Sequence, residues 1–326
     1  MADKSVRNEI LPCFDSDKSL SIHEIQSRLS EQVPERTLRR WLVAEVNKGQ
    51  LIRTGNKRST RYQKNFQNQS RPVFKFLQDK SELQQTQILK QIRDFWTHTS
   101  TALEGNTLTL GDTHFLLEEG LTVSGKPLKD HQEVVGHAKA IEIMYQSLSQ
   151  PVTEALCFKL HQAIQTENVN DIYKPYGDWK KEVNGTYTVD SNNQQVYLEY
   201  ALPEDVPKLM DEIMQTINSA NQVSLQQAHV WYARIHVGIV HIHPFWDGNG
   251  RIARLLANVP LLKSGLPPIV IPQEKRREYI QLLADYEIAV GKIDISTGVW
   301  PQPDLLKAFE SFCLQCYQDT RRVLRG

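Results

Sequence analysis

The stretch from residue 241 to 254 constrains the fold of this chain most strongly. It reads HIHPFWDGNGRIAR and separates two apolar segments, Trp231 to Val240 and Ile252 to Leu262, each with the spacing of a buried helix. The turn between them places two glycines around an asparagine, so backbone N–H groups can approach a ligand closely, and a helix begins directly after it. Because a helix N-terminus attracts anions, this stretch predicts an anion site between two core helices.

Charged side chains in the same stretch indicate which anion and which chemistry. Arg251 and Arg254 stand three residues apart and can share one helix face, which favours a polyphosphate over a single carboxylate. A carboxylate beside phosphates, here Asp247, is most simply a magnesium ligand. An imidazole such as His243, with an ordinary pKa of about 6.5, can take a proton from a hydroxyl at neutral pH. Together these residues predict group transfer from a nucleoside triphosphate.

The same residues resemble a known family. The stretch His243-Pro244-Phe245 with Gly248-Asn249-Gly250-Arg251 and Arg254 is similar to the complete signature of Fic-domain proteins. Three upstream segments also resemble Fic segments: Glu104 to Thr109, Gly125 to Leu128, and Glu133 to Ala138. The resemblance covers roughly Glu82 to the C-terminus. It implies a mainly α-helical bundle that transfers AMP from ATP to a Ser, Thr or Tyr hydroxyl of a target protein and releases pyrophosphate.

The resemblance also implies a role for each motif position. It makes ATP the substrate and Mg²⁺ the metal ion. By this resemblance, His243 is the base for the target hydroxyl, Asp247 is the Mg²⁺ ligand, and Phe245 is a core anchor. The anion hole is formed by Gly248, Asn249 and Gly250. Of the two arginines, Arg251 holds the phosphates and Arg254 holds the γ-phosphate.

Residues Trp179 to Tyr200 predict a β-hairpin, because alternating apolar residues flank a polar tip at Asp190 to Asn193. This hairpin resembles the Fic flap, which pairs with the target segment as an added strand. Two departures leave the target open: Lys180 stands where Arg is common, and Tyr200-Ala201-Leu202-Pro203 replaces a Pro-rich stretch.

A second element is similar to the inhibitory motif of the family. Ser100 precedes Glu104 by four residues, which places both on one helical face, and Gly-Asn follows. Glu104 is then expected to pair with Arg254 and to occupy the place of the γ-phosphate, so that a helix of the same chain inhibits the enzyme. The alternative is an ordinary carboxylate at a helix C-terminus.

Helical spacing predicts most of the remaining elements. The expected helices run over about 82–105, 203–219, 224–240, 249–263 and 274–290. His236 and His241 fall on an apolar segment and are expected to be packed core histidines. Cys313 and Cys316 are expected as two thiols on a late helix, because no second pair of metal ligands lies near them.

The first 64 residues predict a separate, smaller domain. Ser21 and Glu24 have capping-box spacing, residues 34–46 have helical spacing, and residues 51–62 read as a short hairpin, which together resemble a winged helix-turn-helix. The predicted organisation is residues 1–64, a linker over 65–81, and the Fic part over 82–326.

This smaller domain is strongly basic. From Pro34 to Lys64 there are nine Lys and Arg against two Glu, a local net charge of +7. Duplex DNA phosphates are one expected partner, and a solvated face or a protein-docking surface is the alternative. The candidate DNA-binding residues are Arg36, Arg39, Arg40, Lys57, Arg58 and Arg61.

The composition of the chain argues against a disordered, a membrane-spanning or a secreted protein. The chain has 326 residues, 40% apolar and 23% charged, with 38 basic and 38 acidic residues, which excludes wholesale disorder. No uncharged stretch approaches the roughly 20 apolar residues of a membrane span, and the N-terminus is charged where a signal peptide is apolar. With four scattered cysteines this predicts no membrane partner and a cytoplasmic location.

Two other functions stay open. The same fold can remove AMP from a target, with Glu104 positioning a water. A DNA-binding regulator whose Fic domain only senses nucleotide is the second alternative, although it has no need of His243. The target protein and a homodimer are not specified by the sequence.

Overall fold

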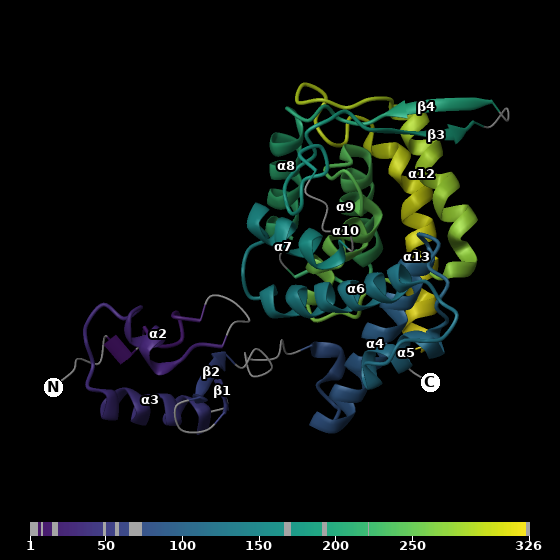
Figure 1. The fold of residues 1–326 in the computed structure, drawn as a ribbon. Helices are drawn as coiled ribbons and strands as arrows, with labels where there is room; N and C mark the ends of the chain where they lie inside the picture. Colours follow the sequence, from purple (N-terminus) through teal and green to yellow (C-terminus); the bar gives the residue numbers. More distant parts are fainter. Residues whose placement is uncertain are drawn as a thin grey trace. The chain divides into compact units, whose positions relative to one another are not determined.

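The computed structural model describes residues 6–7, 9–14, 19–47, 50–55, 59–64, 74–165, 171–190, 194–220 and 222–323. The chain divides into two compact units, Met1–Arg71 and Pro72–Gly326 (Figure 1). Each unit encloses its own apolar core.

Within its described residues, the smaller unit includes two helices and a hairpin. They are α2 (Ile22–Gln26), α3 (Glu35–Asn47), β1 (Leu51–Thr54) and β2 (Arg61–Lys64). The strands are antiparallel, and Leu20 adds an isolated bridge to Tyr62. Ser21 and Glu24 form the predicted capping box at the start of α2. These elements cover the predicted helices and hairpin, and the assignment as a winged helix-turn-helix stays a prediction.

The basic residues of this unit lie at its surface where the structure describes them. Arg36, Arg39 and Arg40 are exposed on α3. Arg39 pairs with Glu35 at 2.5 Å, and Arg61 lies 3.3 Å from a carboxylate oxygen of Glu24. Exposed ion pairs of this kind are weak and are screened by salt, so the arginines can exchange these carboxylates for other anions. The candidates Lys57 and Arg58 lie outside the described residues.

The larger unit begins earlier than the predicted end of the linker. Phe74 and Leu77 are 4% and 3% exposed and belong to the core of this unit. The backbone N–H of Phe76 donates to the carbonyl of Gly265 at 3.1 Å. Phe74 and Leu77, which fall in the expected linker over 65–81, are thus packed in the core of the larger unit, whereas residues 78–81 are exposed.

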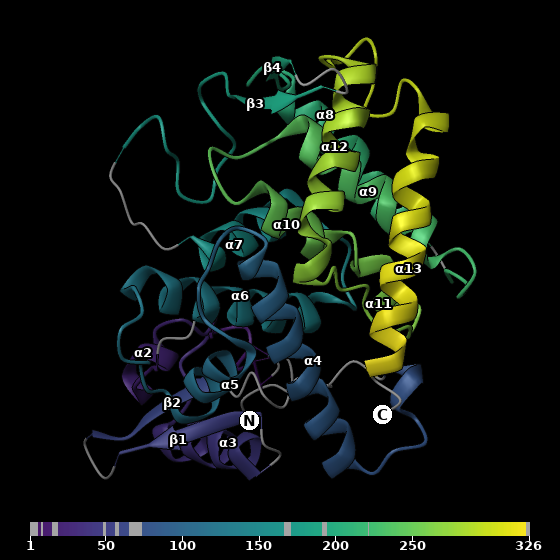
Figure 2. The same cartoon turned by 90° about the vertical axis from the view of Figure 1, so that its right-hand side faces the viewer.

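The larger unit is a bundle of helices around α9, with one β-hairpin at its edge (Figures 1 and 2). Helix α9 packs against α8, α10, α11 and α13, and α6 packs against α4, α5, α7 and α10. The elements are α4 (Glu82–Ala102), α5 (Leu110–Glu119), α6 (Leu128–Ser147), α7 (Glu154–Ile164), β3 (Gly185–Val189), β4 (Gln195–Glu199), α8 (Val206–Ser219), α9 (Ala228–Ile242), α10 (Asn249–Leu256), α11 (Val259–Lys263), α12 (Arg276–Val290) and α13 (Lys307–Val323), with short 3-10 turns at Lys75–Leu77, Gln273–Lys275 and Pro303–Leu306. This confirms the predicted mainly α fold with a small β-hairpin.

Helix α9 is central because nearly every side of it is apolar. Its residues from Ile235 to Ile242 are buried, as predicted for His236 and His241. Gly238 lets α8 and the chain near Val299 approach closely, since a Cβ there would lie 2.7 Å from Ile213 Cδ1. The helix therefore forms a rigid support that ends next to the predicted anion site.

One predicted helix is interrupted. The expected helix over 249–263 is two helices, α10 and α11, with a break near Asn258. Pro260 has no N–H to continue the helical ladder. The Asn258 side chain is instead bonded to the backbone N–H and C=O of Ile269 at 2.7 and 2.9 Å, and to the carbonyl of Arg254 at 3.0 Å.

The flap region is a regular hairpin within a longer irregular segment. Strands β3 and β4 are antiparallel, with Gly185 opposite Glu199 and Val189 opposite Gln195. Residues 191–193 of the predicted tip lie outside the described residues. The Lys180 N–H donates to the carbonyl of Pro244 at 2.9 Å, which ties the base of the hairpin to the loop that follows α9.

Within the part of the chain that the structure describes, no helix has both the length and the apolar character needed to span a bilayer.

Candidate active site

The candidate site is the loop between α9 and α10. Helix α9 ends at Ile242, and His243 caps it in the left-handed conformation, with φ 52° and ψ 59°. This backbone region is uncommon for residues other than glycine, and among the described residues only Gln222 shares it. The reversal directs the chain from the core helix α9 to the N-terminus of α10.

The tautomer of His243 follows from its one hydrogen bond. Its Nδ1 donates to the carbonyl of Val240 at 3.1 Å, which leaves the Nε2 lone pair as a proton acceptor. Burial, with a smaller contribution from the positive charge of Lys180, lowers the pKa of His243 to about 4. The imidazole is therefore neutral at pH 7, which is the form a base needs.

Asn249 holds the loop in shape. Its buried side chain accepts from the backbone N–H of Phe245 at 2.8 Å and donates to the carbonyl of Phe245 at 2.9 Å. Phe245 is fully buried and stacks on the ring of His161, with ring centroids 4.1 Å apart. Because the side chain of Asn249 turns inward, only its backbone N–H is left for the predicted anion hole.

At both glycines of the loop, Gly248 and Gly250, side chains of other segments lie too close to leave room for a Cβ atom. Gly248 has φ 80°, and a Cβ there would lie 2.8 Å from Ile164 Cδ1. At Gly250 a Cβ would lie 2.7 Å from Oε1 of Glu104 and 3.0 Å from Nη1 of Arg254. Glycine at position 250 thus allows Glu104 to reach the first turn of α10.

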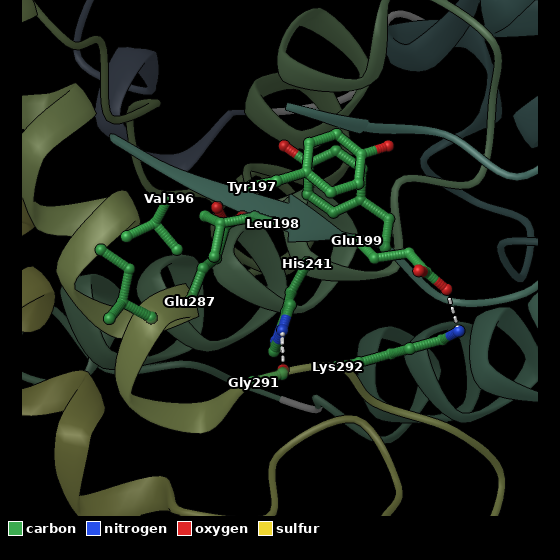
Figure 3. A pocket seen from close by; sticks show the side chains of 10 residues that line it. Val196, Tyr197, Leu198, Glu199, His241, Glu287, Gly291 and Lys292 are labelled. Atoms are coloured by element: carbon green, nitrogen blue, oxygen red, sulfur yellow. Dashed lines mark hydrogen bonds and ion pairs between the residues drawn. The ribbon is translucent and has the colours of Figure 1, made fainter. Parts of the chain in front are cut away.

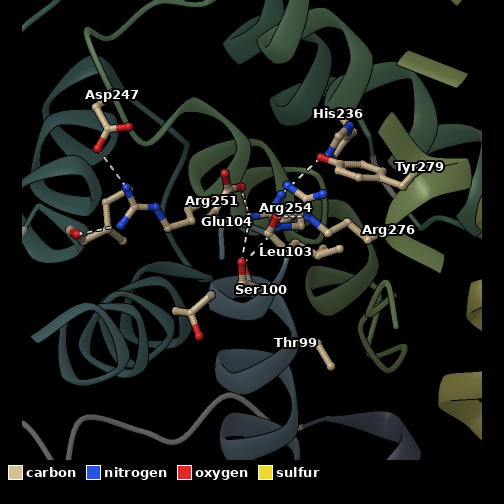
Figure 4. Close-up of polar contacts among 12 residues, drawn as sticks. Thr99, Ser100, Leu103, Glu104, His236, Asp247, Arg251, Arg254, Arg276 and Tyr279 are labelled. Atoms are coloured by element: carbon tan, nitrogen blue, oxygen red, sulfur yellow. Dashed lines mark hydrogen bonds and ion pairs between the residues drawn. The ribbon is translucent and has the colours of Figure 1, made fainter. Parts of the chain in front are cut away.

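Arg254 is buried and fully engaged (Figure 4). Its Nη2 lies 2.6 Å from Oε1 of Glu104, and it also donates to the carbonyl of Ser100 at 2.9 Å. Its Nε donates to Oγ of Ser100 at 2.9 Å, and its Nη1 donates to the hydroxyl of Tyr279 at 3.1 Å. The structure thus brings the predicted residues Ser100, Glu104 and Arg254 together, across 150 residues of sequence.

Glu104 is held in its charged form. Burial alone would raise the pKa of Glu104, but the charge and the hydrogen bond of Arg254 outweigh burial and lower it. A carboxylate therefore stands at the N-terminal turn of α10, where an anion is favoured.

Asp247 and Arg251 form a second pair in the same loop. Arg251 Nη2 lies 2.9 Å from Oδ2 of Asp247, and Arg251 is 6% exposed at its side chain against 52% for Asp247. No group of three or more His, Cys, Asp or Glu is placed to hold a metal among the described residues. A single solvent-open carboxylate suits Mg²⁺, which takes its other ligands from phosphates and water.

Three contacts of the site were not expected from the sequence. Tyr279 on α12 bonds Arg254, Tyr200 stacks on His243, and Lys180 donates from Nζ to Oδ1 of Asn184 at 2.6 Å beside the loop. Burial lowers the pKa of Lys180 to about 7. The departures from the family pattern at Lys180 and at Tyr200 to Pro203 marked two of these residues in the sequence, and no sequence signal marked Tyr279.

The helical fold and the loop between α9 and α10 agree with a comparison of the sequence with known families. Residues 151–261 match the model of the Fic/DOC family, and the chain carries a Fic domain over this region. The match confirms the predicted resemblance to Fic proteins over residues 151–261, which include the loop between α9 and α10.

Named proteins resemble the chain over a wider region. Protein adenylyltransferase fic-1 of Caenorhabditis elegans is 30% identical over 214 residues, which is 64% of this chain and 39% of that protein. Protein adenylyltransferase Fic of Drosophila melanogaster is 31% identical over 187 residues, 56% of this chain and 35% of that protein. The chain matches less than two fifths of the length of these relatives.

Solved structures share the fold. A Fic domain containing signaling protein from Bacteroides thetaiotaomicron has a TM-score of 0.65 and 28% identity, over 80% of this chain and 95% of that one. Fic-1 from C. elegans has a TM-score of 0.53 and 22% identity, over 93% and 82% of the two chains. The second likeness concerns the fold alone.

Proposed function

We propose that this chain is a protein adenylyltransferase, which transfers AMP from ATP to a Ser, Thr or Tyr hydroxyl of a target protein. One observation carries the proposal: the loop after α9 places a neutral imidazole, a solvent-open carboxylate and two buried arginines at the N-terminus of α10. The names of the relatives, adenylyltransferases at about 30% identity, support the same activity.

The base of the proposed reaction is Nε2 of His243. It takes the proton of the target hydroxyl, whose oxygen forms a bond to the α-phosphorus of ATP while the bond to pyrophosphate breaks. Nδ1 is held by the carbonyl of Val240, so the ring keeps the tautomer with the lone pair on Nε2. The hydroxyl-bearing residue of the target stays unidentified.

The phosphates would be bound by the loop and the arginines. The N-terminal turn of α10 from Gly248 to Gly250 offers backbone N–H groups and the positive end of the helix. In this proposal Arg251 and Arg254 supply positive charge, and Arg254 binds the γ-phosphate. Mg²⁺ held by Asp247 would neutralise charge on the phosphates.

Autoinhibition follows from the contact between Arg254 and Glu104. With Oε1 of Glu104 at 2.6 Å, the guanidinium is already paired with an anion, so a γ-phosphate must displace the carboxylate. Helix α4, which ends at Ala102, would thus inhibit the same chain through the residues directly after it.

Removal of AMP is the second candidate. Glu104 is charged and lies at the loop, so it can orient and deprotonate a water against an AMP-modified target. An AMP-modified substrate incubated with the wild type and with Glu104→Gln distinguishes the two directions, because only hydrolysis needs the carboxylate.

The smaller unit and the location of the protein are also proposed. Exposed arginines on α3 support binding to duplex DNA, and a homodimer is left to measurement. All four cysteines are buried thiols, which supports a reducing compartment such as the cytoplasm.

The proposed activity is tested with labelled ATP and Mg²⁺ in a Glu104→Gly background. Loss of a positioned base costs about 10²- to 10⁴-fold in rate. His243→Ala should therefore abolish self-modification and target modification but retain ATP binding, while His23→Ala in the smaller unit should leave both unchanged. Undiminished transfer by His243→Ala would refute the assignment of the base.

A further inference from the structure

A pocket of about 370 Å³ lies between β4 and the C-terminal end of α12 (Figure 3). Leu198 and Tyr200 border it from the hairpin, His241 from α9, and Glu287 and Lys292 from α12 and the residues after it. None of the residues from Gly248 to Arg254 lines it, so it is distinct from the anion loop. Its volume is in the range of small-molecule sites.

Glu287 is the unusual residue of this pocket. It is 6% exposed, and its Oε1 is buried without a hydrogen-bond partner among the described residues. In Figure 3 the side chain rises from α12 toward β4. Burial raises the pKa of Glu287 to about 8, and no neighbouring positive charge offsets this. A buried carboxyl without a partner is costly and is normally compensated.

His241 contributes a second acceptor without a donor. Its Nε2 lies 2.8 Å from the carbonyl of Gly291 and must donate to it, so Nδ1 carries the lone pair. Nδ1 is buried and also has no partner among the described residues. Burial lowers the pKa of His241 to about 4, which keeps the ring neutral. Oε1 of Glu287 and Nδ1 of His241 are thus two buried acceptors without a donor, in two residues that line the pocket.

The charge balance of the pocket favours a cation. Lys292 is paired with Glu199, so it does not neutralise Glu287. Tyr197 and Tyr200 are also among the lining residues, and their rings contact Tyr187 and His243 respectively. A ligand with several N–H donors and one positive charge would satisfy both unpartnered acceptors, Oε1 of Glu287 and Nδ1 of His241.

We propose that this pocket binds a guanidinium or primary ammonium group, with Glu287 as its counter-charge and Nδ1 of His241 as a second acceptor. The group belongs either to a free small cation or to an Arg or Lys side chain of a protein segment lying along β4. The proposal does not depend on the proposed transfer of AMP, because it concerns binding at a separate pocket.

Calorimetric titration of the full chain with n-butylguanidinium tests the proposal. The control ligand is N-butylurea, which has nearly the same shape and no charge. At pH 8.5 the wild type should prefer the cation at least tenfold, and Glu287→Gln should lose this preference. Glu278→Gln, on the exposed side of the same helix, should keep it. Equal binding of the two ligands by the wild type, or an unchanged preference in Glu287→Gln, would overturn the proposal.

The pH dependence of the wild type gives a second test that needs no variant. A cation binds the ionised carboxylate, so affinity should fall about tenfold for each pH unit below 8. The other titratable residues that line the pocket are Tyr197, Tyr200, His241 and the paired Glu199 and Lys292. Burial raises the pKa of Tyr200 and lowers that of His241, so neither changes charge between pH 6 and 8.5. Affinity that is constant over this range would exclude Glu287 as the counter-charge.

The source of the cation is resolved with a blocked peptide, Ac-Val-Arg-Val-NH2, and its citrulline counterpart. Tighter binding of the arginine peptide than of n-butylguanidinium, lost with citrulline, identifies a protein segment. Equal or weaker binding of the peptide identifies a free small cation.

Discussion

The ring of Tyr200 lies flat against the imidazole of His243, with ring centroids 3.8 Å apart and planes 5° apart. Tyr200 directly follows β4 and is 5% exposed, so a residue at the base of the hairpin fixes the orientation of the imidazole. The hairpin is therefore in direct contact with the proposed base, His243.

This contact predicts a positioning role for Tyr200. Tyr200→Ala should lower kcat for AMP transfer by about 10²-fold, because a base displaced by about 1 Å loses its alignment, while KM for ATP stays nearly constant. Tyr200→Phe should retain most of the activity, since the ring alone makes the stack. Initial rates in the Glu104→Gly background measure this, with Tyr173→Ala as an exposed control. A similar loss in Tyr200→Phe would assign the effect to the hydroxyl.

Removing Glu104 should release Arg254 for nucleotide. A charge-assisted pair is worth roughly 1.5–3 kcal/mol, so Glu104→Gly should tighten ATP binding by about one to two orders of magnitude. Arg254→Ala in the same background should reverse most of this gain. Titration of ATP into the three proteins is the measurement, with Glu119→Gln on α5 as the control. Identical ATP affinity in wild type and Glu104→Gly would rule out autoinhibition by this residue.

Glu287 should make the stability of the fold depend on pH. The pKa of Glu287 is raised to about 8 in the folded chain from an ordinary value of 4.5, so the folded state binds more protons between these limits. The free energy of unfolding should thus fall as pH rises from about 4.5 to 8. Relative to Glu287→Gln, the wild type should lose up to about 1.4 kcal/mol per pH unit in this window. Urea unfolding of both proteins at pH 5.5, 6.5 and 7.5 measures the difference, and parallel curves would contradict it.

If the smaller unit binds duplex DNA, its affinity must depend steeply on salt. Each neutralised phosphate contributes a slope of about 0.9 in log K against log salt. Arg36→Ala and Arg40→Ala together should reduce the slope by about 2, while Lys208→Ala in the larger unit should not change it. Fluorescence anisotropy with a labelled duplex at several salt concentrations provides the test. Absence of binding at low salt would favour protein docking.

Local signals of the sequence predicted local structure well. Ser21 with Glu24 indicated the start of α2, and the apolar segment before His243 indicated the central helix α9. The spacing of Ser100 and Glu104, with the family resemblance, also predicted the contact to Arg254. These signals succeed because each depends on neighbours in sequence or on a motif with fixed spacing.

Contacts set by tertiary packing were not predictable in this way. Tyr279 reaches Arg254 from a helix 25 residues later, and nothing in its own sequence surroundings marks it. The inward turn of the Asn249 side chain and the break at Asn258 depend on backbone groups that only the folded chain supplies. Phe74 was assigned to a linker because the core that buries it lies far away in sequence.

The two hydrogen bonds between Asn249 and the backbone of Phe245 have a thermodynamic consequence for ligand binding. They give the loop its shape before any nucleotide arrives, so little conformational entropy is left to lose when phosphates bind. Calorimetry of ATP binding to a chain without Glu104 should accordingly show a small heat-capacity change, unlike that of a loop that folds around its ligand.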